Sequence, residues 1–116
     1  MSKSARPYYV LIEQALDQID LYRSPTEAAF LADQKSQDAI LMRLQQIGEN
    51  LIKVREIDPE GFAHKHDSWH KLAGLRNVIS HSYEVIEPEV IWTIVSQHLQ
   101  PFRITIEAAL DELSPS

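Results

Sequence analysis

The sequence predicts an all-α fold, an up-down bundle of four to five helices formed by a single domain. Apolar residues recur at helical spacing along most of the 116 residues, and no segment alternates with the period of two that is typical of a strand. Only three glycines are present, which disfavours a fold built on tight β-turns. With 44% hydrophobic and 24% charged residues, the composition is that of a soluble globular domain. We expect this domain to span residues 1–116, with frayed tails at 1–5 and 114–116.

The first helix is predicted over residues 6–23, because six residues form one apolar stripe at helical spacing: Tyr8, Ile12, Ala15, Leu16, Ile19 and Tyr22. A short helix should follow. The segment Ser24-Pro25-Thr26-Glu27 has the form of a capping box, with Ser24 as the cap, proline at the first helical position and Glu27 at the third.

A long second amphipathic helix is predicted from Asp33, a suitable N-cap, to about residue 57. Its apolar stripe consists of Ile40, Leu44, Ile47, Leu51 and Val54. Gly48 lies inside this helix, where glycine costs about 1 kcal/mol relative to alanine, and indicates either a close helix crossing or a tolerated weakness. The segment Asp58-Pro59-Glu60-Gly61 then predicts a turn.

The third helix should begin near Ser68 and carry an apolar arc that fades at His81, before a loop that reaches Glu87. The members of the arc are Trp69, Leu72, Leu75 and Ile79. Pro88 is placed to open the last helix, and Pro101 should kink or break it. His98 falls on the apolar stripe of this helix, so we expect it to be a hydrogen-bonded core residue.

A net charge of -6 and a pI near 5.3 argue against binding of nucleic acid through a broad basic face, so any such contact must be local. One stretch is locally basic, with Asp67 as its only acidic residue: His64, Lys65, His66, His70, Lys71, Arg76 and His81. Cysteine is absent, which excludes disulfides and thiolate chemistry. No apolar run approaches a membrane span and no signal peptide is recognisable, so we expect a cytoplasmic protein without membrane contact.

Arg76 lies within the apolar arc of the third helix, close in angle to Trp69 and Leu72. A guanidinium in that position needs a carboxylate, a carbonyl or a bound anion as its partner, and Glu49 on the long helix is the candidate. The pair could be a purely structural salt bridge between helices. Alternatively, the stem of Arg76 packs while its charged end reaches solvent.

His81 follows Arg76 by five residues, which is about 140° around an ideal helix. The two side chains converge only if the helix ends or distorts there, or if a second subunit completes the site. An imidazole suits proton transfer near neutral pH, although His81 could instead end the helix with Asn77 as a local hydrogen-bond partner. Tyr83 adds a hydroxyl that could be modified, or a ring that could stack on a base. A cation for phosphate and an imidazole for a proton are the minimum for metal-free RNA cleavage through the 2′-hydroxyl.

The segment from Arg76 to Tyr83, R-N-V-I-S-H-S-Y, resembles the Arg-x-x-x-x-His-x-Tyr motif of the HEPN superfamily. It is most similar to the HepT-like toxins that are paired with minimal nucleotidyltransferases. Further landmarks cover nearly the whole chain: residues 37–40, 47–50, 69–77 and 90–92. Asn50 stands where an alanine is usual and Ser68 where a proline is frequent, and neither is a catalytic position.

The resemblance implies an antiparallel homodimer in which the two motifs approach each other at one cleft. Arg76 and His81 would be the catalytic residues of a metal-independent endoribonuclease that acts on RNA without a cofactor or metal. Tyr83 would be adenylylated by the nucleotidyltransferase antitoxin of a type VII-like toxin-antitoxin pair, which silences the toxin. From their positions, Asn77 and Glu49 are supporting residues. Two alternatives stay open, a non-catalytic helical module that binds a nucleotide or a nucleotidyltransferase, and a purely structural dimerising bundle.

Overall fold

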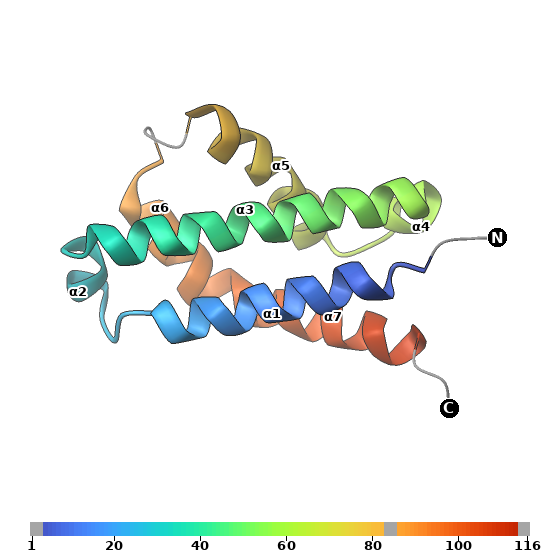
Figure 1. Ribbon diagram of the computed structural model, residues 1–116, viewed down its shortest axis with the longest axis horizontal. Coiled ribbons are helices and arrows are strands. Elements are labelled where there is room, and N and C mark those ends of the chain that lie inside the picture. The colour runs from blue at the N-terminus through green and yellow to red at the C-terminus, as the bar shows by residue number, and fades with distance from the viewer. Residues whose placement is uncertain (1–3, 83–85, 114–116) are drawn as a thin grey trace.

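The computed structural model describes residues 4–82 and 86–113, and all the regular structure in these two ranges is helical (Figure 1). The four long helices are α1 (Arg6–Tyr22), α3 (Gln34–Ile57), α5 (Asp67–Ser82) and α7 (Leu99–Leu113). The shorter elements are α2 (Glu27–Leu31), α4 (Pro59–Ala63), α6 (Pro88–Thr93) and the π-helical turn η2 (Ile94–His98). The predicted all-α bundle is confirmed, with short helices at the corners between the long ones. None of the helices within the described ranges is long and apolar enough to cross a membrane.

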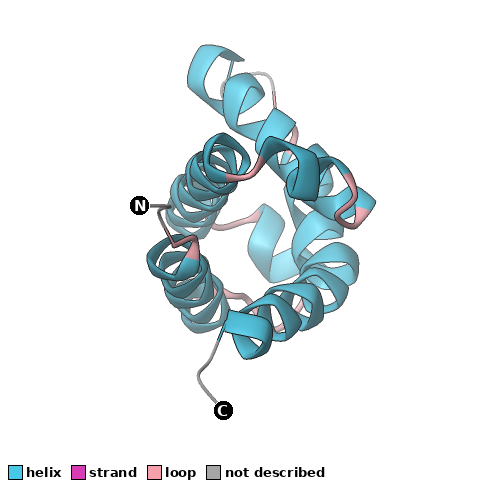
Figure 2. Ribbon diagram, turned by 90° about the vertical axis from the view of Figure 1, so that its right-hand side faces the viewer, coloured by secondary structure: helices cyan, strands magenta, loops and turns pink. Residues whose placement is uncertain are grey.

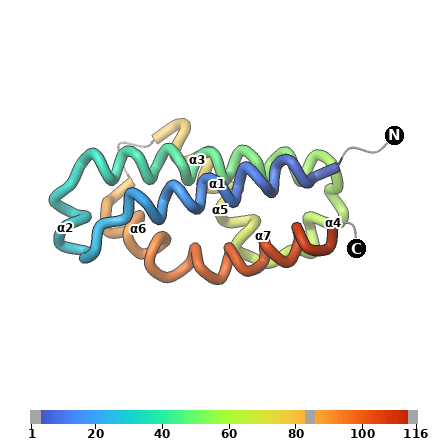
Figure 3. Tube along the Cα trace, turned by 60° about the horizontal axis from the view of Figure 1, so that its bottom comes forward, coloured from blue at the N-terminus to red at the C-terminus, as the bar shows by residue number. Residues whose placement is uncertain are grey.

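The core lies between α1, α3 and α7, which run alongside one another, and α5 closes it at one side (Figures 1 and 3). Trp69 anchors α5 in this core, since it is only 1% exposed and its Nε1 donates to Thr105 Oγ1 on α7 at 2.7 Å. The centroid of its ring lies 5.7 to 6.4 Å from the ring centroids of Tyr9, Phe62 and Phe102. Side chains from α1, α4, α5 and α7 therefore meet around one indole.

Three short polar side chains begin helices, and two of them correct the sequence reading. Thr26, and not Ser24, caps α2, because its hydroxyl accepts from the backbone N–H of Ala29 at 3.1 Å. Asp33 caps α3 as predicted. The predicted turn at residues 58–61 is the start of α4, where Asp58 accepts from the N–H of Gly61 at 3.0 Å. An aspartate followed by proline serves equally as a helix N-cap and first helical residue, which explains the error.

Pro101 does not break the last helix, since helical structure continues from Pro88 to Leu113, and the departure from α-helical geometry is the turn η2 just before the proline. Leu99 N–H donates to the carbonyl of Ile94, five residues back, which is π-helical hydrogen bonding. A wider turn before Pro101 accommodates a ring that would otherwise collide with the carbonyl four residues back. The wider turn also changes which residues face inward. Val95 and Leu99 are buried and His98 is exposed, so the predicted core position of His98 is wrong.

The helix α5 crosses α3 and projects from the ring formed by the other helices, as the topmost helix of Figure 2. The crossing occurs at Gly48. A Cβ atom built on Gly48 would lie 2.6 Å from Arg76 Cβ and 2.8 Å from the carbonyl oxygen of Leu72. Real side chains do not approach so closely, so only glycine permits this separation of the two helices. The close crossing, one of the two readings of Gly48 from sequence, is confirmed.

Candidate functional site

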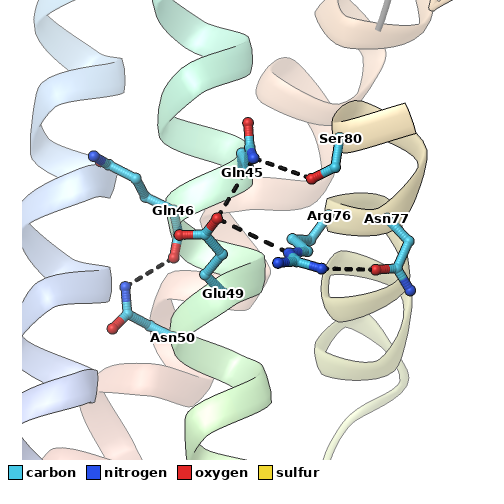
Figure 4. Close-up of polar contacts among 7 residues, drawn as sticks. All are labelled: Gln45, Gln46, Glu49, Asn50, Arg76, Asn77 and Ser80. Atoms are coloured by element: carbon cyan, nitrogen blue, oxygen red, sulfur yellow. Dashed lines mark hydrogen bonds and ion pairs between the residues drawn. The ribbon is translucent and has the colours of Figure 1, made fainter. Parts of the chain in front are cut away.

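The polar residues of the candidate site lie on two facing helix surfaces, which Figure 4 shows from the side. The α3 surface carries Gln45 and Glu49, and the α5 surface carries Arg76, Asn77 and Ser80. Because Gly48 brings the backbone of α3 against the Cβ of Arg76, the Arg76 side chain starts at the contact line and extends toward Glu49. The helix crossing therefore determines where the guanidinium can lie.

Arg76 pairs with Glu49, the partner that the sequence predicts. The distance from Arg76 Nε to Glu49 Oε1 is 3.9 Å, which is an ion pair but too long for a hydrogen bond. Arg76 Nη1 also donates to Asn77 Oδ1 at 3.1 Å. Arg76 Nε is shielded from solvent and has no hydrogen-bond partner, although the side chain as a whole is 37% exposed. The stem thus packs on α3 with its Nε–H buried and without a hydrogen bond, while other parts of the side chain reach the surface.

His81 is exposed in the last turn of α5. The helix is continuous α-helix from Asp67 to Ser82, so no distortion separates Arg76 from His81. Five residues of regular helix leave their side chains about 140° apart. A distorted helix therefore does not bring the side chains of Arg76 and His81 together within one chain. Tyr83 lies outside the described residues.

Sequence reasoning did not single out Gln45 and Ser80, which the structure adds to the site. Gln45 Nε2 donates to Ser80 Oγ at 3.1 Å and to Glu49 Oε1 at 3.4 Å (Figure 4). A signal was available, because each of the two stands four residues from a residue of the predicted pair and so shares its helix face. What the sequence lacks is the register between α3 and α5, which brings the two faces together.

The other members of the basic stretch are partly occupied by local contacts. Lys71 Nζ pairs with Asp67 Oδ2 at 3.6 Å, and the Lys65 ammonium lies 5.3 Å from the Trp69 ring centroid. His70 packs edge-on against Phe62, with 4.9 Å between ring centroids. Within the residues that the structure describes, no three metal-ligating side chains gather at one point. Of the basic stretch, Arg76 belongs to the polar cluster of Figure 4, and His81 directly follows the cluster residue Ser80 in the chain.

Comparisons with a family model and with individual proteins both point to one family of ribonucleases. The family model described as "Ribonuclease HepT-like" matches residues 12–109. The chain is 36% identical over 89 residues to "Putative RNase MJ0127" of Methanocaldococcus jannaschii, an alignment that covers 75% of this chain and 70% of that protein. It is 28% identical over 102 residues to "Probable ribonuclease HepT" of Thermococcus cleftensis, covering 85% and 89% of the two chains. No solved structure matches the chain. The chain therefore belongs to the HepT-like ribonuclease family.

Proposed function

We propose that this protein is a metal-independent endoribonuclease, the toxin of a type VII-like toxin-antitoxin pair, with Arg76 and His81 as its catalytic residues. The proposal rests on the family to which the chain belongs and on the partly exposed, weakly paired guanidinium of Arg76. Its guanidinium is held at the surface by a buried stem, and its nearest carboxylate lies at 3.9 Å, beyond hydrogen-bond distance. A phosphate can therefore be bound without first breaking a strong internal contact.

In the proposed reaction the 2′-hydroxyl of the RNA attacks the adjacent phosphorus. A bond forms between the 2′-oxygen and phosphorus while the bond to the 5′-oxygen breaks, which leaves a 2′,3′-cyclic phosphate and a 5′-hydroxyl. Arg76 stabilises the negative charge on the phosphate oxygens. The 2′-hydroxyl loses its proton as it attacks and the departing 5′-oxygen gains one, and His81 takes part in this transfer as the base or the acid. Glu49 and Asn77 contact the Arg76 guanidinium and support its orientation.

We further propose that the active form is an antiparallel homodimer whose two motifs share one cleft. The support is the regular α5, which directs Arg76 and His81 of one chain to different sides of the helix. In a dimer, Arg76 of one copy would act with His81 of the other.

Regulation is proposed to occur at Tyr83, through adenylylation by a minimal nucleotidyltransferase antitoxin. AMP at that position would add a negative charge and bulk two residues from His81, in the path of the RNA. Intact mass after incubation with such an enzyme and ATP should rise by one AMP in the wild type. If Tyr83→Phe gained AMP as well, Tyr83 would not be the target.

The catalytic assignment is tested by RNA cleavage in EDTA with purified wild type, Arg76→Ala and His81→Ala. We expect each variant to lose at least roughly 100-fold in rate, the lower range for loss of a proton-transfer group. Arg55→Ala and His64→Ala are matched controls, because both residues are exposed and neither is a member of the polar cluster drawn in Figure 4. Full activity of Arg76→Ala or His81→Ala would refute the assignment.

Mixing the two inactive variants tests the shared site. If Arg76 and His81 act across the dimer, half of the randomly mixed dimers contain one intact site of two, and about a quarter of the wild-type activity returns. No recovery from subunits shown to exchange would refute the shared arrangement. The second candidate function, a module that holds a nucleotide without cutting RNA, is favoured if Arg76→Ala loses nucleotide binding in a wild-type background that shows no cleavage.

A further inference from the structure

Gln45 connects the two halves of the candidate site. Its single amide nitrogen carries two hydrogens, and these are directed to Ser80 Oγ at 3.1 Å and Glu49 Oε1 at 3.4 Å. Both bonds can therefore exist together. Glu49 in turn faces Arg76 Nε, and Ser80 directly precedes His81 in the chain. One side chain of α3 thus contacts the partner of Arg76 and the neighbour of His81 (Figure 4).

The last turn of α5 has few other attachments to the bundle. Ile79 is buried, and Gly48 holds the backbone near Arg76, one turn earlier. Among the described contacts of α5, two polar ones reach α3, the Arg76–Glu49 ion pair and the hydrogen bond between Ser80 and Gln45. The second is the nearer of the two to the end of the helix. Its loss would leave the His81 turn held chiefly by Ile79.

We propose that Gln45 is a positioning residue of the ribonuclease site, which holds the Glu49 carboxylate beside Arg76 and fixes the last turn of α5 through Ser80. This inference rests on the proposed function. Gln45 is partly buried and does not belong to the apolar core, so its role is separable from folding. An error of about 1 Å in the placement of a reacting group is sufficient to reduce a rate by about 100-fold, so even a modest shift of His81 should be measurable.

The first experiment measures single-turnover RNA cleavage and RNA binding for Gln45→Ala, Ser80→Ala and the double variant. We expect the rate to fall about 10-fold in each single variant, as for residues that orient a catalytic group, with RNA affinity changed less than about twofold. The double variant should be no slower than the slower single one, because both remove the same hydrogen bond. Additive losses, or a loss of affinity alone, would overturn the inference.

Asn50→Ala is the matched control. Asn50 also lies on α3 and is partly buried, but its amide donates at 2.8 Å to the carbonyl of Gln46 in its own helix, away from α5 (Figure 4). We expect this variant to cleave RNA at the wild-type rate. If Asn50→Ala lost as much cleavage activity as Gln45→Ala, replacing any polar residue of α3 by alanine would lower the rate, and Gln45 would have no particular role.

Hydrogen exchange gives a readout that does not depend on cleavage. The backbone amides of residues 79–82 should exchange about 10-fold faster in Gln45→Ala and Ser80→Ala than in wild type or Asn50→Ala, while amides in α1 and α7 remain unchanged. Unchanged exchange at residues 79–82 would refute the positioning role whether or not the protein cuts RNA. Absence of cleavage in the wild type, together with faster exchange in the two variants, would instead refute the proposed function and retain Gln45 as the link to the last turn.

Discussion

Substituting alanine for Gly48 should destabilise the protein although alanine is the better helix former. The added Cβ would lie 2.6 Å from Arg76 Cβ and 2.8 Å from the Leu72 carbonyl oxygen. Carbon atoms in contact are normally separated by about 3.5 to 4.0 Å, so the two helices would have to move apart by nearly 1 Å. Neither neighbouring atom can rotate away, since one is backbone and the other is attached directly to it.

Two opposing effects determine the size of the change. Inserting a methyl group into a tightly packed contact costs about 1 to 3 kcal/mol, and replacing a helical glycine by alanine recovers about 1 kcal/mol. With backbone atoms on the receiving side the cost should lie near the top of its range, which leaves a net loss of about 2 kcal/mol. For a chain of this length that corresponds to a decrease in Tm of roughly 8 °C.

Gly74 provides a matched control on the other helix of the crossing. A Cβ there meets no atom within 4 Å, so Gly74→Ala should show only the helix-propensity gain of about 1 kcal/mol. Urea unfolding followed by the helical circular dichroism signal measures both variants under the same conditions. The two changes should have opposite signs. A Gly48→Ala protein as stable as the wild type would mean that the crossing is not closely packed, and the account of how Arg76 is placed would be wrong.

Two further predictions concern stability away from the site. Thr105→Val leaves the buried Trp69 Nε1–H without its acceptor and should cost about 1 to 3 kcal/mol in urea unfolding, whereas Thr93→Val, whose hydroxyl bonds within its own exposed turn, should be near neutral. Hydrogen bonds from the Ser36 hydroxyl and then its backbone N–H lower the pKa of Asp33 below its ordinary value of 3.8. The carboxylate therefore stabilises the fold above pH 3.8 and loses that contribution as the pH falls through the lower folded-state pKa. The urea midpoints of wild type and Asp33→Ala should differ at pH 7 and converge in acid; a gap that persists below the folded pKa would contradict this.

The elements that sequence predicted best are those with long apolar stripes. Periodicity located α1 and α3 to within a residue or two at either end, because each buries one continuous face. The short helices were harder, since Thr26 and Asp58 carry signals that serve turns and helix starts alike. His98 was misplaced because a π-helical turn changes the phase of the helix, and single-sequence periodicity assumes a constant phase.

In the candidate site, too, features set within one helix were predicted and features set between helices were not. Spacing within one helix brought Arg76 to the face of α5 that meets α3, and charge complementarity selected Glu49 as its partner. Gln45 and Ser80 were not found, because their contact depends on the register between two helices that are 35 residues apart at this point. Register of that kind follows from packing of the whole core and from the close approach at Gly48, and no local pattern contains it.

The crossing of α3 and α5 at Gly48 has a consequence for engineering. Gln45 and Glu49 belong to one rigid helix, and Arg76, Asn77, Ser80 and His81 to another, so their relative placement is described by the separation and angle of two rods. The outer contact of α1 with α7, where Arg103 pairs with Asp17 and Asp20, involves neither of these helices, so substitutions that raise thermal stability should be sought there. Substitutions along the crossing change all the distances across the site at once, so variants with graded activity should be sought there.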